Sequence, residues 1–145
     1  EQYPQMAILG GKDGMDFAID KQQQKFEIVP YTDGASADFR FVAHVDRAPM
    51  WINKVLYMEK LKHIDFSFAP FQFDDIELCL RAWLEGYQVG WYKTEFSSLS
   101  AGGMRIWNNA FTAEQCQKNI QRLYELYADN GFVIHNRIEL SKVEK

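Results

Sequence analysis

The sequence predicts an α/β fold, because short strand-like segments and longer helix-like segments alternate along its 145 residues. Apolar residues make up 47% of the chain and aromatic residues 15%, which is ample for the core of one domain. No apolar stretch approaches the roughly 18 residues that a membrane-spanning helix needs, and no signal-peptide pattern is present. We therefore expect one α/β domain over residues 1–136, followed by a polar tail over residues 137–145.

The expected strands are short segments that are apolar or alternate in polarity, and turn-forming residues separate them. The polar run 21–25 and the pair Asp33-Gly34 are turn signals. The segment 39–45 is the strongest strand candidate, since it carries apolar residues on both sides, as a strand covered on both faces would. The expected strands are residues 6–9, 15–19, 26–29, 39–45, 88–92 and 132–134.

Three helices are expected from the spacing of apolar side chains on one face. The first covers residues 53–62, and the second begins at the acidic pair Asp74-Asp75. The third should open with a capping box formed by Thr112 and Gln115 and end at Gly131. The polar residues from 136 onward are expected to fray.

The helix that follows the acidic pair has the most informative pattern. Asp74 and Glu77 have the spacing of a capping box. Glu77 and Arg81 are four residues apart and should pair, and Gly86 is placed to end the helix in a left-handed conformation. A cap explains Asp74 but explains Asp75 only in part, because one cap needs one side chain. Two interpretations remain open: the pair only caps the helix, or Asp75 is a rigidly held base.

A longer stretch around this helix resembles a known family. The shared features are an Arg-containing strand, an aromatic loop, an acidic pair that opens a helix, and Gly-Tyr before the next strand. In this sequence they are residues 45–52, 63–73, 74–83 and 86–92. Together they resemble the acceptor-side, C-terminal half of a family 2-like glycosyltransferase with the GT-A fold, over about residues 8–105.

The resemblance implies an inverting transfer of sugar from a nucleotide sugar to an acceptor hydroxyl. Asp75 would be the catalytic base that takes the hydroxyl proton, and Asp74 would bind the acceptor sugar. Arg47 and Trp51 would line the acceptor cleft, and Arg105 would meet the diphosphate of the leaving group. The implied fold is a partial GT-A-like mixed sheet with flanking helices that lacks the N-terminal nucleotide-binding half.

Each binding residue also has a plain structural interpretation. Asp74 can be a helix cap, and Arg47 can pair with any nearby acid. Burial tendencies favour Trp51 as a core residue over a sugar-stacking one. Arg105 lies in a glycine-rich segment, where a solvated Arg is equally expected.

The donor side of the family pattern is missing from this sequence. The family carries an Asp-x-Asp motif and β-α-β units that bind the nucleotide sugar with a divalent cation, Mn or Mg. Asp13-Gly14-Met15-Asp16 has the wrong spacing, no such units precede Tyr3, and residues 94–100 contain no metal-binding His. We therefore expect the donor site to be absent or supplied by another chain. This chain alone should be inactive and should bind no metal ion.

Charge and cysteine content limit the partners and the location. Sixteen basic and 20 acidic residues without a basic patch argue against nucleic acid. Cys79 and Cys116 fall on helix faces and favour free thiols, as in a reducing compartment. The expected location is therefore the cytoplasm, with the inner membrane face as an alternative. A sugar acceptor is the expected partner, and a nucleotide-sugar donor only together with the missing half.

A non-enzymatic interpretation is kept beside the enzymatic one. The same half-fold, without a donor site, would serve as a binding or assembly module. In either case the missing half would leave apolar sheet surface and strand edges open, and such edges tend to pair. Self-association through the N-terminal third is therefore expected.

Overall fold

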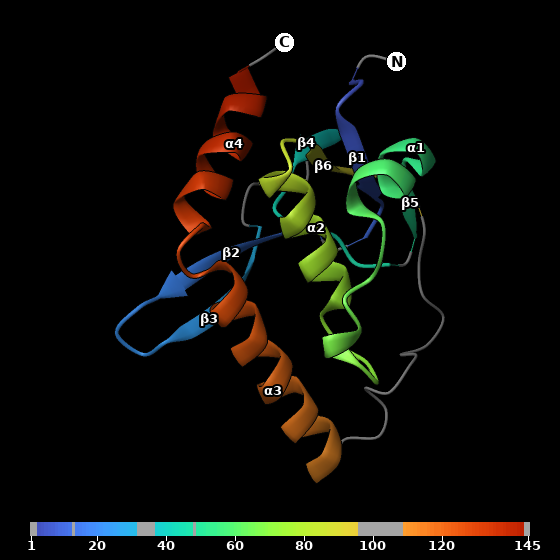
Figure 1. Cartoon of the computed structure of the whole chain (residues 1–145). Helices are drawn as coiled ribbons and strands as arrows, with labels where there is room; N and C mark the ends of the chain where they lie inside the picture. Colours follow the sequence, from blue (N-terminus) through green and yellow to red (C-terminus); the bar gives the residue numbers. More distant parts are fainter. Residues whose placement is uncertain (1–2, 13, 32–36, 48, 96–108, 144–145) are drawn as a thin grey trace.

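Strands β1 (Met6–Gly10) and β6 (Gln88–Tyr92) pair in parallel at the centre of a four-stranded mixed sheet. Strand β4 (Phe39–Phe41) runs antiparallel to β6 on one side, and β5 (Met50–Ile52) runs antiparallel to β1 on the other. The computed structural model describes residues 3–12, 14–31, 37–47, 49–95 and 109–143. Within these ranges the expected mixed α/β class is confirmed (Figure 1).

A hairpin of β2 (Met15–Asp20) and β3 (Lys25–Pro30) forms a separate two-stranded sheet. The expected polar turn joins the two strands, and the Asp20 carboxylate accepts from the backbone N–H groups of Gln22 and Gln23, each at 2.9 Å. Phe17 and Phe26 are buried and stack with their ring centroids 5.4 Å apart. The hairpin thus adds its own apolar face to the core.

Helix α2 (Asp74–Leu84) lies over β1 and β6 and fills the core with the stripe predicted from its spacing (Figure 1). Its Trp83 side chain is 1% exposed and donates from Nε1 to the Val42 carbonyl at 3.0 Å. The helix ends as expected, because Gly86 has a φ of 89° and donates to the Trp83 carbonyl at 3.1 Å. Tyr87 donates to the Ala82 carbonyl at 2.9 Å and completes this C-terminal cap.

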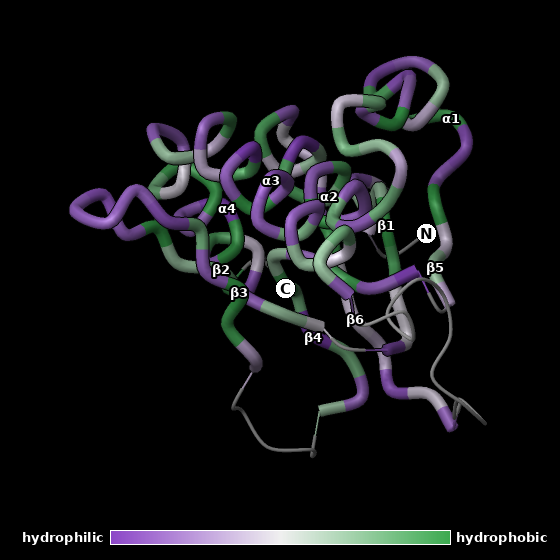
Figure 2. Tube along the Cα trace, turned by 90° about the horizontal axis from the view of Figure 1, so that it is seen from below, coloured by the Kyte–Doolittle hydropathy of each residue, from purple (hydrophilic) through white to green (hydrophobic). Residues whose placement is uncertain are grey.

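Helices α3 (Ala110–Tyr127) and α4 (Gly131–Val143) complete the layer on the same side of the sheet as α2 (Figure 2). The expected strand at residues 132–134 is wrong, since these residues form the first turn of α4. Gly131 begins α4 instead of ending α3. A short apolar run such as 132–134 fits a helix turn as well as a strand, so its pattern alone did not distinguish them; within α4 only Ile134 of this run is buried.

The expected fraying from residue 136 onward is wrong up to Val143, because these residues belong to α4. One face of α4 is buried, and one of its polar side chains binds α2. Ile138 and Ser141 are buried. Arg137 donates to the carbonyls of Trp83 at 2.7 Å and Leu84 at 2.5 Å, so it satisfies the open C-terminal end of α2. The last helix therefore helps to fix α2 in place.

Residues 54–61 are helical, close to the expected 53–62, but with two geometries. The α-helical turn α1 (Lys54–Leu56) is capped by Asn53, whose side chain accepts from the N–H groups of Val55 and Leu56. It continues as a π-helical turn, η1 (Tyr57–Leu61). A short 3-10 turn, η2 (Phe66–Phe68), follows before α2.

The segment 39–45 is a regular strand only over β4, and the prediction of a longer strand is wrong. Beyond Phe41 the chain stays buried, and His44 forms an isolated antiparallel bridge with Met15 of the hairpin. The apolar residues on both sides therefore reflect burial between the two sheets rather than a long ladder.

No helix in the described part of the chain is long and apolar enough to cross a membrane. The expected turn at Asp33-Gly34 and the glycine-rich segment with Arg105 lie outside the described residues.

Candidate functional site

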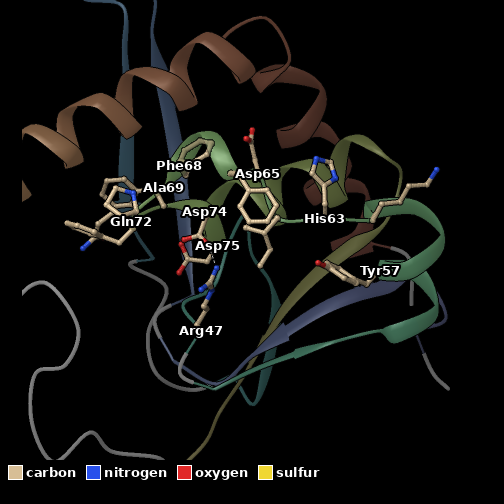
Figure 3. A pocket seen from close by; sticks show the side chains of 15 residues that line it. Arg47, Tyr57, His63, Asp65, Phe68, Ala69, Gln72, Asp74 and Asp75 are labelled. Carbon is tan, nitrogen blue, oxygen red and sulfur yellow. Dashed lines mark ion pairs between the residues drawn. The ribbon is translucent and has the colours of Figure 1, made fainter.

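A pocket of about 690 Å³ opens where α2 begins (Figure 3). It is lined by Arg47, by Tyr57 of η1, and by residues 62–66 and 68–75, which connect η1 to α2. Its volume lies in the range of about 300–1,000 Å³ that is usual for small-molecule sites. The pocket is therefore large enough for a ligand of sugar size.

The acidic pair opens α2, but not as a capping box. Phe73 occupies the N-cap position with a φ of 67° and makes no side-chain cap bond. Asp74 forms an ion pair with Arg47 instead (dashed in Figure 3). Asp75 lines the same pocket, and its Oδ1 accepts from the Ile76 N–H at 2.9 Å. The predicted reciprocal cap between Asp74 and Glu77 is wrong.

Glu77 is buried, and an ion pair and a hydrogen bond compensate its carboxylate. Arg81 donates to its carboxylate from Nε at 2.9 Å and from Nη2 at 3.1 Å, as the four-residue spacing predicted. The Tyr127 hydroxyl donates to Glu77 Oε1 at 2.8 Å. Burial, together with the charge of Glu77, raises the pKa of Tyr127. These contacts join α2 to α3.

The same Arg81 also holds one wall of the pocket. Its guanidinium donates to the carbonyl of Leu61, and to that of His63 at 2.6 Å. The segment 61–63 is therefore tied to α2 by a side chain whose charge is balanced by Glu77.

The opposite wall is held by two amide side chains of α3. Asn119 is 0% exposed, and its Nδ2 lies 3.0 Å from the Phe68 carbonyl, 2.8 Å from that of Phe71 and 2.8 Å from that of Gln72. Gln115 donates from Nε2 to the Ala69 carbonyl at 3.0 Å. Helix α3 thus binds four carbonyls of the loop that shapes the pocket.

The capping box expected at Thr112 and Gln115 begins one turn earlier. Asn109 caps α3, accepting from the Thr112 N–H at 3.0 Å, and the Thr112 hydroxyl accepts from the Asn109 N–H at 3.1 Å. This shift leaves Gln115 inside the helix, where it reaches the pocket loop.

The pocket loop contains two consecutive residues with left-handed backbones. Gln72 has a φ of 79° and Phe73 a φ of 67°. Such conformations cost about 1–2 kcal/mol each for residues other than glycine. The hydrogen bond from Asn119 to the Gln72 carbonyl helps to hold this strained turn, which directs the chain into α2 at Asp74.

Charges of both signs line the pocket. Three carboxylates (Asp65, Asp74, Asp75) and the basic side chains Arg47 and Lys62 contribute to its walls. Burial opposes ionisation of Asp65, but hydrogen bonds from Ser67 and the charges of Arg122 and Arg81 outweigh it and hold the pKa of Asp65 below its usual value. The result is a polar floor beside the rings of Phe66, Phe68 and Phe71, a combination that suits a polyhydroxylated ligand.

The residues described here do not provide a set of ligands for the Mn or Mg ion that the resemblance implies for the complete enzyme. No group of three or more His, Cys, Asp or Glu side chains in the described ranges could hold a metal ion. Asp74 is engaged by Arg47.

The structure brings together three of the five residues predicted for the site: Arg47, Asp74 and Asp75. Trp51 is not part of this pocket. It lies on the edge strand β5 and is 53% exposed, so it is not a core residue. Its ring contacts the Tyr92 ring edge-on, with the two ring centroids 5.2 Å apart. Arg105 lies outside the described residues.

The residues that fix the pocket walls were missed because their partners are remote in sequence. Asn119 and Gln115 occupy the buried face of α3 together with Leu123 and Tyr127. Polar side chains on an otherwise apolar helix face must find hydrogen-bond partners. That pattern was the available signal for a long-range contact.

Comparisons of this chain with protein-family models, with curated proteins and with solved structures gave no match. The functional assignment therefore depends on the chemistry of the site.

Proposed function

We propose that this chain is the acceptor-binding and catalytic-base half of an inverting, nucleotide-sugar-dependent glycosyltransferase. The observation that carries the proposal is the acidic pair at the start of α2, which lines a pocket with an Arg47–Asp74 ion pair and an aromatic wall. The partial GT-A-like arrangement, with the donor half supplied elsewhere, belongs to the same proposal.

The proposed reaction places the acceptor hydroxyl at Asp75. The hydroxyl oxygen attacks the anomeric carbon of the donor sugar and forms the new glycosidic bond. The bond from that carbon to the diphosphate breaks, and the nucleoside diphosphate leaves with the electron pair. The Asp75 carboxylate accepts the hydroxyl proton. The helix N-terminus favours an ionised carboxylate at this position.

The two aspartates take different roles in the proposed site. Asp74 is committed to Arg47, so we assign it to binding and orienting the acceptor through its remaining acceptor capacity. Asp75 follows it on the same helix turn and takes the role of base. The buried supports from α2 and α3 keep both at fixed positions, which a positioned base requires.

A second candidate, a non-catalytic binding or assembly module, uses the same pocket. The Arg47–Asp74 pair and the aromatic wall are sufficient to bind a sugar without proton transfer. The two candidates differ in the role of Asp75. In the first it takes a proton during turnover, and in the second it only contributes to the shape of the pocket.

The test measures the turnover of sugar transfer by a protein that contains these residues together with a nucleotide-sugar-binding unit. Asp75→Asn keeps the size of the side chain and should lower turnover by roughly 10²–10⁴-fold. Asp129→Asn is the control, because the Asp129 side chain is 94% exposed and lies outside the pocket. Turnover of Asp75→Asn within a factor of about three of wild type, far below that range, would favour the binding module.

Calorimetry on this chain alone tests the expected division of labour. UDP- and GDP-sugars with manganese should give no micromolar binding signal, because the donor site is proposed to lie elsewhere. A metal-dependent micromolar signal would place the donor site on this chain and overturn the half-enzyme assignment.

A further inference from the structure

A second hollow lies beside the pocket, on the other side of the turn η2. Its volume is about 500 Å³, and it is bounded by Phe66, Ser67 and Ala69 and by one face of α3. Phe66 and Ala69 line both hollows. The two hollows are therefore neighbours that share a wall.

The shared wall carries an exposed aromatic ring. Phe66 is 82% exposed, whereas Phe68, two residues later in the same turn, is 1% exposed and belongs to the core. An aromatic side chain that is exposed to water gains no stabilisation from burial of its apolar surface. Its ring offers a flat apolar surface against which the C–H face of a sugar packs, and it does so between the two hollows.

The second hollow has a different charge from the pocket. Lys118 and Arg122 are four residues apart on the same face of α3, and both line the hollow. Like charges at this spacing repel each other. Glu125 is 3.8 Å from Arg122 and offsets one of the two charges. Among the residues that line the hollow, one net positive charge remains; Arg122 also interacts with the nearby carboxylate of Asp65.

Arg122 is directed toward the turn that separates the hollows. Its Nε lies 3.3 Å from the Ser67 hydroxyl oxygen, next to Phe66 in the sequence. The basic wall and the aromatic ring are therefore adjacent parts of one surface. An anionic group that reached past Phe66 would meet two cations, one of which is a planar guanidinium suited to carboxylate, sulfate or phosphate oxygens.

We propose that the acceptor is an anionic oligosaccharide that spans both hollows. This inference rests on the proposed acceptor site. The reacting sugar occupies the pocket at Asp74 and Asp75, the chain crosses the Phe66 ring, and a following unit places its anionic group against Lys118 and Arg122. Acceptor specificity then depends on length and charge at a distance from the reacting hydroxyl.

The test begins with this chain on an array of oligosaccharides of one to six units, which are neutral, uronic-acid-containing, sulfated or phosphorylated. Binders are then titrated by NMR at low and high salt. Affinity should rise with length among anionic sugars, and this gain should weaken at high salt, because exposed charges are screened. The anionic arms show which group is preferred.

Three variants locate the contacts. Phe66→Ala should weaken binding of anionic oligosaccharides by about tenfold, the upper end of what aromatic contacts contribute, and the loss should grow with ligand length. The double variant Lys118→Ser/Arg122→Ser should remove the preference for anionic over neutral oligosaccharides. Phe132→Ala is the matched control, because Phe132 is 76% exposed on α4 and lines neither hollow.

The possible failures are distinguishable. If sugars bind in the pocket but length, charge and the Phe66 variant make no difference, the inference is overturned and the acceptor site stands. If no sugar on the array binds, the proposed acceptor site fails and this inference fails with it.

Discussion

Asn119 should be the residue whose loss disturbs the pocket most without touching a ligand. Its amide group has two N–H donors for three loop carbonyls at 2.8–3.0 Å, and the side chain is fully buried. Asn119→Leu removes both donors at similar volume. At about 1.5 kcal/mol for each lost bond, we expect the free energy of unfolding to fall by about 3 kcal/mol. With a urea slope of about 2 kcal/mol/M, the midpoint should decrease by about 1.5 M.

The same change should act locally as well as globally. Without the bond to the Gln72 carbonyl, the left-handed turn at Gln72 and Phe73 can relax, so the start of α2 should loosen. Hydrogen exchange should accelerate at the Ala69 and Glu77 amides, which donate within this segment. Gln117→Leu, at an exposed position on the same helix, is the control. A stability loss below about 1 kcal/mol, less than one of the lost bonds, with unchanged exchange at both amides, would refute this reasoning.

Three further outcomes are expected. Arg81→Met should lower the free energy of unfolding by about 3–5 kcal/mol in urea titrations, since it leaves the Glu77 carboxylate buried without its cation; a loss under about 1 kcal/mol would show that the pair is dispensable. Burial lowers the pKa of His44 to about 4, against the opposing influence of Asp16, from 6.5 in the unfolded chain. The unfolded state therefore binds more protons between pH 6.5 and 4, and stability should fall by about 2 kcal/mol between pH 7.5 and 5. His44→Leu should remove this component, while the opposite contribution of His135, whose pKa is raised by Asp16, remains in both proteins; an identical pH profile in the variant would contradict it. Light scattering at roughly 100 µM should give more than the 17.0 kDa monomer mass, because β4 and β5 are the outer strands of the described sheet and open edges tend to pair; a monomer mass would show that the edges are protected.

Local patterns predicted the elements that are governed by local physics. Gly86 ended α2 because its left-handed backbone excludes most other residues, and Glu77 paired with Arg81 because four residues make one helix turn. The strands β1, β2, β3 and β6 followed from short apolar segments between turns. These features depend on neighbours in the chain.

The errors concern choices that tertiary contacts decide. Asn109 and Thr112 both have side chains suited to capping, and only the position of α3 selects Asn109. Asp74 has the spacing of a cap, but Arg47, 27 positions earlier, binds it in the folded chain. Asn119 reaches carbonyls 47–51 positions away. No local pattern contains these distances, so the acidic pair was predictable as a candidate site while its supports were not.

The most direct test of the central claim is a structure, by crystallography or NMR, of this chain with a bound acceptor oligosaccharide. We expect a sugar hydroxyl within about 2.6–3.2 Å of the Asp75 carboxylate, the reach of a general base, and the sugar against Asp74 and the aromatic wall of the pocket. A sugar bound in this pocket with every hydroxyl beyond the reach of Asp75, or bound at another surface altogether, would contradict the account.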